Sequence, residues 1–195
     1  MEYLSFSEAL RDSLVENPDY DIKNWIYVPN TYLSYRYLLG TRGVNPLVCI
    51  GINPSTAEPD NLDNTLKSVQ RIAKGNGFDS FIMINVYPER ATNPDDMSTC
   101  LIKQIHEENL KAFKYVLEHS KNPTIWAGWG TIVEKRGYLK DCLKSMYDIS
   151  LAFNASWVHA GAISKKGHPH HPLYLRKDSI IESFDINTYI NEILK

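Results

Sequence analysis

The sequence is poor in cysteine, has no long apolar run and carries no excess of positive charge. Its three cysteines, Cys49, Cys100 and Cys142, are too few and too scattered for a disulfide framework or a cysteine-only metal cluster. No stretch approaches the roughly 18 apolar residues that a membrane span needs. Because 21 basic residues face 23 acidic ones, the formal net charge is −2. These features argue against a membrane protein, a disulfide-rich secreted scaffold and a strongly basic chain.

What is present is the composition of a globular protein, with 43% hydrophobic and 23% charged residues and no internal repeat. A chain of 195 residues can bury most of its apolar surface in one core, so we expect one domain. The N-terminal segment carries Glu2, Glu8, Asp12 and Glu16, unlike a signal or transit peptide. We therefore expect a cytoplasmic protein with no membrane contact.

Strand and helix patterns alternate along the chain. Residues 5–16 predict a short helix with a Ser5–Glu8 capping box, and residues 25–41 predict a hairpin or two edge strands. Compact apolar runs predict buried strands at 46–52, 80–86, 123–129 and 155–161. Helical spacing predicts helices at 62–73, 101–117, 132–146 and, capped by Asp178, 180–193.

This alternation predicts an α/β fold, a three-layer sandwich around a central, mostly parallel sheet. Within a single domain of residues 1–195 we expect an N-terminal helix and extension at 1–30, a core at 31–178 and a C-terminal helix at 179–195. Ligands bind such sheets at the carboxyl ends of the strands. The loops after the four buried strands should therefore converge on one site.

Two of these loops carry amide side chains directly after a strand. Asn53 follows the first buried strand, and Pro54 stiffens the turn beside it. Asn85 ends the second strand and can read a base or an amide edge in both directions. Arg90, a few residues on, could hold a phosphate or a carboxylate. The alternative is that Asn, Pro and Ser occur here for turn geometry alone, and that Arg90 is solvated.

The loop after the fourth strand is rich in histidine. His168, His170 and His171 resemble metal ligands, but no paired cysteine accompanies them and adjacent histidines point in divergent directions. We therefore expect no metal and no other cofactor. A histidine acting on a substrate is the favoured interpretation, and a surface histidine without a role is the alternative.

The same region is the basic part of the chain. Residues 149–177 contain no acidic residue and have a formal charge of +4, contributed by Lys165, Lys166, Arg176 and Lys177. Such a patch beside the site would suit the phosphates of a nucleotide or a nucleic acid. The alternative is that these lysines and arginines occur here only because the loop is exposed to solvent.

Taken together, the blocks YRYLLGTRG, GINPSTAEPDNLDNT, INVYPERATNP and GHPHHPLYL resemble a bacterial and phage family of unknown function, numbered 1643. The resemblance runs from about Tyr35 to Leu175. More distantly, the order of the blocks is similar to the uracil-DNA glycosylase superfamily, which has a parallel α/β sandwich fold. GINP at 51–54 resembles its mismatch-specific branch. NVYPERATNP at 85–94 resembles its iron–sulfur branch, whose four-cysteine cluster is absent here.

The glycosylase resemblance implies roles for particular residues. Asn53 would orient the hydrolytic water and His171 would stabilise the departing base, while Asn85 would read the base edge. Ser55 is small where uracil-specific enzymes have a bulky Tyr, so 5-substituted pyrimidines would fit. Substrate contacts are expected from Pro54, Ser55, Thr56, Asn85, Tyr87, Arg90, Trp129, Leu173 and Tyr174. In this interpretation Leu173 and Tyr174 form an apolar wedge beside the cationic patch.

The leading hypothesis is hydrolysis of an N-glycosidic bond that joins a base to DNA or to a nucleotide. The first alternative is a non-catalytic module that binds a nucleotide or single-stranded nucleic acid. The second is an enzyme acting on a small, free, nucleoside-like ligand. One fold supports many functions, so all three stay open at this stage.

Overall fold

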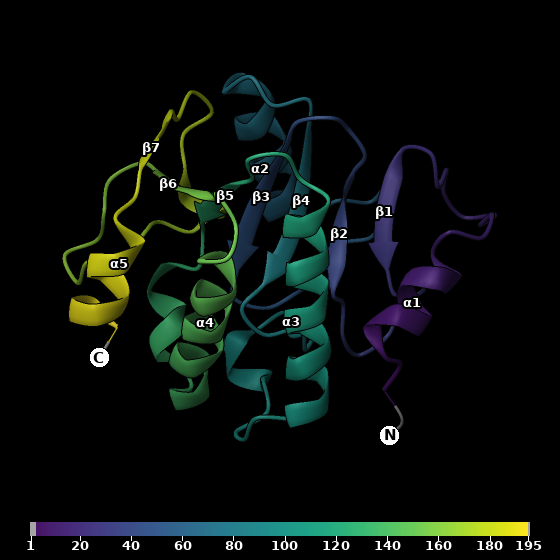
Figure 1. Ribbon diagram of the computed structural model, residues 1–195, viewed down its shortest axis with the longest axis horizontal. Coiled ribbons are helices and arrows are strands. Elements are labelled where there is room, and N and C mark those ends of the chain that lie inside the picture. Colours follow the sequence, from purple (N-terminus) through teal and green to yellow (C-terminus); the bar gives the residue numbers. More distant parts are fainter. Residues whose placement is uncertain (1–2, 195) are drawn as a thin grey trace.

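Seven strands form one sheet, in the order β1-β2-β4-β3-β5-β6-β7 (Figure 1). The computed structural model describes residues 3–194, so Glu2 and the extreme ends of both predicted terminal segments lie outside it. The strands are β1 (Trp25–Val28), β2 (Leu38–Thr41), β3 (Pro46–Gly51), β4 (Ser80–Asn85), β5 (Thr124–Ala127), β6 (Ser156–Ala160) and β7 (Ile181–Ser183). The predicted hairpin is confirmed, because β1 and β2 pair antiparallel.

The helices follow the predicted periodicity, with shifted ends. They are α1 (Phe6–Asp12), α2 (Asn64–Gly75), α3 (Lys103–Glu118), α4 (Gly137–Ser150) and the short α5 (Ile186–Thr188). The Ser5–Glu8 capping box is confirmed at the start of α1. The helix predicted over 132–146 is divided, since a 3₁₀ turn at Gly130–Glu134 precedes α4. Within residues 3–194, no helix is long and apolar enough to cross a bilayer.

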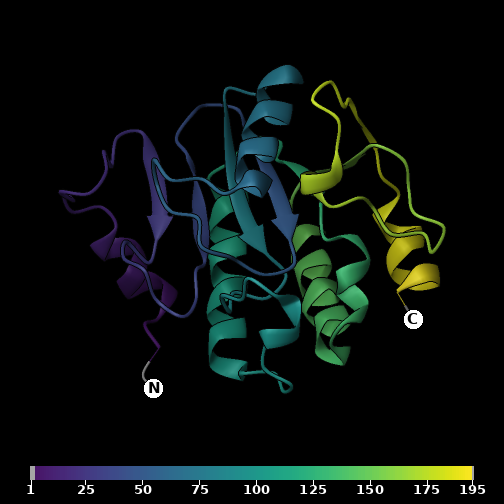
Figure 2. The same ribbon diagram turned by 180° about the vertical axis from the view of Figure 1, so that it is seen from behind.

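The sheet is covered on both faces. Helices α3 and α4 lie over one face (Figure 1), and α2 lies over the other (Figure 2). The packing of β3 explains why its sequence is apolar throughout. Val48 and Ile50 pack on the side of α3 and α4, whereas Leu47 and Cys49 pack on the side of α2. Successive side chains of a strand point to opposite faces, so a strand buried on both has no polar positions.

The expectation of a mostly parallel sheet is wrong, because the sheet is mixed. The central pairings β3–β4, β3–β5 and β5–β6 are parallel. The outer pairings β1–β2, β2–β4 and β6–β7 are antiparallel. The physical reason is that no α-helix crosses the sheet between β1 and β2, between β2 and β3, or between β6 and β7, so the chain reverses its direction at each of these connections.

The predicted C-terminal helix from Asp178 is also wrong in its first half. Residues Ile181–Ser183 form β7 and pair with β6, and the Ile181 amide donates to Asn76 Oδ1 at 3.0 Å. Hydrogen bonds to the unpaired backbone groups at the edge of β6 stabilise a strand here more than the helical spacing of the isoleucines stabilises a helix. The helical turn starts later, and Asp185 caps it by accepting from the Thr188 amide at 2.9 Å.

The first prediction concerns Gly40, where β2 lies against β4. A β carbon at Gly40 would meet the Phe81 carbonyl oxygen and would lie 2.8 Å from Ile82 Cα, so neighbouring backbone would have to move. We expect Gly40→Ala to lower the free energy of unfolding by about 2 kcal/mol or more, measured by urea denaturation. Gly75→Ala is the control, because nothing lies within 4 Å of its β-carbon position. Equal stability of the two variants would contradict the tight β2–β4 contact.

Candidate functional site

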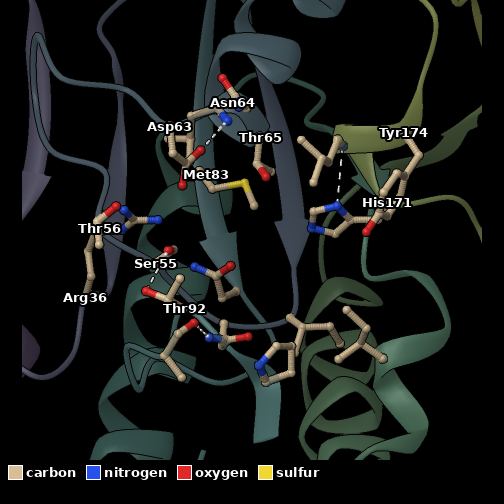
Figure 3. A pocket seen from close by; sticks show the side chains of 18 residues that line it. Arg36, Ser55, Thr56, Asp63, Asn64, Thr65, Met83, Thr92, His171 and Tyr174 are labelled. Carbon is tan, nitrogen blue, oxygen red and sulfur yellow. Dashed lines mark hydrogen bonds between the residues drawn. The ribbon is translucent and has the colours of Figure 1, made fainter. Parts of the chain in front are cut away.

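A pocket of about 450 Å³ opens at the carboxyl ends of the parallel strands. The loops that follow β3, β4, β5 and β6 all contribute to it, so the predicted convergence of these loops is confirmed (Figure 3). The residues that line it are Arg36, Ile52, Asn53, Ser55, Thr56, Asp63, Asn64, Thr65, Leu66, Met83, Asn85, Ala91, Thr92, Pro94, Ile132, His171, Leu173 and Tyr174.

Asn85 is the most unusual residue of this lining. Its side chain is 0% exposed, yet neither its Oδ1 nor its Nδ2 has a hydrogen-bond partner. A β carbon at Gly51 would lie 2.9 Å from Asn85 Oδ1 and against the terminal methyl of Met83. Gly51 therefore makes room for both side-chain ends. Because a buried polar group without a partner is costly, this amide needs an explanation outside the protein's own hydrogen bonds.

His171 lies across the pocket from Arg36 in Figure 3. Its Nδ1 accepts a hydrogen bond from the Leu173 amide at 3.3 Å, so the neutral ring carries its proton on Nε2. Figure 3 shows this second nitrogen on the pocket side. Burial lowers the pKa of His171 to about 4, against a smaller opposing effect of Asp63. At neutral pH the residue is therefore an uncharged hydrogen-bond donor.

Asn53 lines the pocket too, but its amide nitrogen is already used. Nδ2 donates to the Pro54 carbonyl at 3.0 Å and to the Ala91 carbonyl at 2.6 Å. These bonds join the loop after β3 to the loop after β4. The nearby Ser55 hydroxyl lies 3.4 Å from that of Thr92, which joins the same two loops. Asn53 thus has an occupied donor and an amide oxygen for which a ligand or a water remains available.

Two charged residues of the pocket were not identified from the sequence. Arg36 is 1% exposed, and its guanidinium is turned toward the pocket interior (Figure 3). Asp63 caps α2 by accepting from the Leu66 amide at 2.8 Å, and its other oxygen points into the pocket in Figure 3. The available signals were an arginine within an otherwise aromatic run and an N-cap aspartate at a strand-to-helix connection.

Four residues predicted to bind substrate are structural instead of lining this pocket. Pro54 is buried in the turn. The Tyr87 hydroxyl accepts from the Ile102 amide at 2.9 Å. The Trp129 indole donates to Tyr189 at 2.8 Å inside the core. All three residues are buried, and the hydrogen bonds of Tyr87 and Trp129 are made to other segments of the chain.

Arg90 is the fourth of these residues and joins several loops. It donates to the carbonyls of Ser55 and Ala57, and to the Tyr27 hydroxyl at 3.0 Å. Its guanidinium also lies 4.2 Å from the centre of the Tyr32 ring. The sequence left open whether Arg90 binds a ligand or is solvated. Because these contacts use most of its donors, Arg90 instead holds several loops together beside the site.

The predicted cationic patch lies on the surface outside the pocket lining. Lys165, Lys166, Arg176 and Lys177 are all exposed. Two of them are paired, Lys166 with Glu134 at 2.5 Å and Arg176 with Asp178 at 3.2 Å. Leu173 and Tyr174, the predicted wedge, are at the pocket and are 43% and 77% exposed.

The histidine loop divides between core and pocket. His168 is buried, with Nδ1 2.8 Å from the Tyr189 hydroxyl and Nε2 3.3 Å from Glu134. It is therefore part of the packing under the loop, whereas His171 lines the pocket. Among residues 3–194, no three His, Cys, Asp or Glu side chains are grouped to hold a metal ion.

Comparison with known families is consistent with the first resemblance. The model of the family described as "Protein of unknown function (DUF1643)" matches residues 36–173, which is most of the chain. The chain therefore belongs to this family. No curated protein and no solved structure matches it. The matched range begins at Arg36 and includes every residue that lines the pocket except Tyr174.

The neutral state of His171 makes stability depend on pH. Its pKa is about 4 in the folded chain and 6.5 for the free side chain, so between these values only the unfolded chain takes up the proton. As pH falls through this window, His171 should lower the free energy of unfolding by up to about 1.4 kcal/mol per pH unit. We expect His171→Gln to remove that contribution, measured by urea denaturation at several pH values. An NMR titration of His171 near pH 6.5 in the folded protein would contradict the assignment.

Proposed function

We propose that this chain hydrolyses the N-glycosidic bond of a nucleobase bound in the pocket. The observation that carries the proposal is the buried amide of Asn85, whose donor and acceptor both lack a partner. A nucleobase edge presents a donor and an acceptor side by side, which is the complement of a carboxamide. Met83 has a flexible side chain and lies beside this amide, so its movement would open the amide to a base.

His171 and Asp63 supply what the bond cleavage requires. Water adds to the anomeric carbon as the bond from carbon to nitrogen breaks, and the electron pair leaves with the base. Charge that develops on the base is stabilised by the Nε2–H of His171. The proton of the attacking water passes to the carboxylate of Asp63, with the Asn53 amide oxygen orienting that water. The departing base then takes its proton from solvent.

The distant likeness to the uracil-DNA glycosylase superfamily supports the same assignment. The GINP block ends β3 and leads into the pocket, Asn85 ends β4, and the His-Pro block follows β6. In that superfamily these positions orient water, read the base and stabilise the leaving group. Asp63 has no counterpart among the blocks that carry the likeness, and it supplies the base that the Asn53 amide lacks.

Binding of a nucleotide without turnover is the second candidate. It is favoured by the bonds of Asn53, since an amide nitrogen fixed to two carbonyls is what a purely structural residue would show. Under this alternative Asn85 and His171 still recognise a base, and no base is released. The assay below separates the two candidates because hydrolysis releases free base and binding alone does not.

To test hydrolysis, purified protein is incubated with oligonucleotides carrying uracil, mismatched thymine, hypoxanthine or 5-modified pyrimidines, and with the matching nucleosides and monophosphates. We expect free base from at least one substrate, measured by chromatography. Asp63→Asn should lower that rate by about 100-fold while keeping the cap of α2, because Asn is as good an N-cap as Asp. Asp178→Asn, which removes an exposed carboxylate, is the matched control. If every substrate of the panel stays intact, hydrolysis is refuted.

A separate prediction distinguishes recognition by Asn85 from a structural role. We expect Asn85→Leu to keep or raise the free energy of unfolding, because it removes an unsatisfied buried amide at similar volume. Base binding or turnover should fall by about 100-fold. Asn109→Leu is the matched control: its Nδ2 donates to the Asn85 carbonyl at 2.8 Å, so its loss should destabilise the fold. Equal destabilisation by both variants would show that Asn85 is structural.

A further inference from the structure

Arg36 is a buried cation for which the protein provides little compensation. Its Nη1 donates to the Ala57 carbonyl at 3.0 Å, and its Nε has no hydrogen-bond partner. In the part of the chain that the structure describes, no carboxylate lies within ion-pair distance of it. Burying a charge without a partner is expensive, so a group outside the protein is expected to complete this environment.

A second guanidinium increases the local positive charge. Arg90 donates to the same Ala57 carbonyl at 3.3 Å, so the two cations share one acceptor. Burial, and then the charge of Arg90, lower the pKa of Arg36 to about 9, and Asp63 partly opposes this. The guanidinium of Arg36 therefore stays protonated at neutral pH. Arg90 is occupied by its structural bonds, which leaves Arg36 as the cation of the pocket.

The surroundings of Arg36 fit an oxyanion. Hydroxyl groups of Ser55, Thr56 and Thr65 line the same pocket, and Thr65 stands in the first turn of α2. The positive end of a helix favours a negative charge, and a guanidinium binds phosphate through paired donors. In Figure 3 Arg36 and His171 lie on opposite sides of the pocket. A ligand that contacts both must therefore be polar and anionic at one end.

We propose that the substrate is a free nucleoside monophosphate, whose phosphate binds Arg36 while its base reaches Asn85 and His171. This inference rests on the proposed function and names the substrate class of that site. Arg36 is 1% exposed, so the group that it binds has to be enclosed by the protein. A terminal phosphate can be enclosed, whereas the phosphodiester of a DNA strand needs two exits. The exposed cations Lys166 and Arg176, which would otherwise contact a strand, are paired with carboxylates.

The test compares matched ligands by calorimetry: deoxyuridine, thymidine, deoxycytidine and inosine, each with its 5′-monophosphate and with an oligonucleotide that contains the same base. We expect one monophosphate to bind about tenfold or more tightly than its nucleoside and its oligonucleotide. Arg36→Gln should remove that preference and change nucleoside affinity little. Arg36→Lys should restore part of it, since a lysine keeps the charge but not the paired donors. Arg42→Gln, an exposed arginine at the opposite edge of the sheet, is the control.

Equal affinity for nucleoside and monophosphate in the parent protein would overturn the phosphate site. A loss of affinity in Arg36→Gln that is equal for the nucleoside and the monophosphate would overturn it too. An oligonucleotide that binds as tightly as the monophosphate, in an Arg36-dependent way, would overturn the choice of a free nucleotide. Should Arg36→Gln fail to fold, the parent and Arg36→Lys still decide the matter through their monophosphate preference. Tight monophosphate binding without base release would refute hydrolysis and leave the phosphate site standing. Base release without a monophosphate preference would refute the phosphate site and leave hydrolysis standing.

Discussion

The site depends on the antiparallel pairing of β2 with β4. Leu39 lies opposite Met83 and Gly40 opposite Ile82, with so little space at Gly40 that a β carbon would meet the backbone of β4. Since β2 runs against the parallel strands, its beginning lies at the edge where they end. Arg36, two residues before β2, is therefore brought to the pocket. A parallel β2 would place this arginine at the opposite edge, and the pocket would lose its buried cation.

That constraint explains which site residues were predictable from the sequence. Asn53, Asn85 and His171 follow buried strands, and the rule that ligands bind at carboxyl ends brings them together. Arg36 precedes its strand, so the same rule overlooks it. The direction of an outer strand such as β2 follows from the neighbours with which it pairs, and local periodicity contains no information about those neighbours. The same limit applies to β7, where isoleucines at helical spacing pair with β6 because its edge was open.

Hydrogen-bond satisfaction separates structural from ligand-binding candidates more sharply than residue type does. Arg36 and Arg90 both donate to the Ala57 carbonyl, and the Nε of each lacks a partner. Arg90 also donates to the Ser55 carbonyl and the Tyr27 hydroxyl, whereas Ala57 is the one acceptor of Arg36 among the described residues. Asn109 donates to a carbonyl, and Asn85 has neither polar atom bonded. Sequence patterns treat the members of each pair alike, because the partners come from distant segments. Only the folded chain distinguishes the group that holds loops together from the group that is left to a ligand.

The position of Asp63 connects the two ends of the pocket. Its charge acts on His171 and on Arg36 alike, opposing the effect of burial on the pKa of each. Asp63 lines the pocket together with both residues, and in Figure 3 its side chain lies between theirs, where we expect the sugar of a nucleotide whose base contacts His171 and whose phosphate contacts Arg36. There a carboxylate favours the positive charge that develops on the sugar as the glycosidic bond breaks. The same carboxylate would repel a phosphate bound at the sugar position and so favour one orientation of the ligand. In the function we propose, one arrangement of charges therefore both orients the ligand and stabilises the transition state.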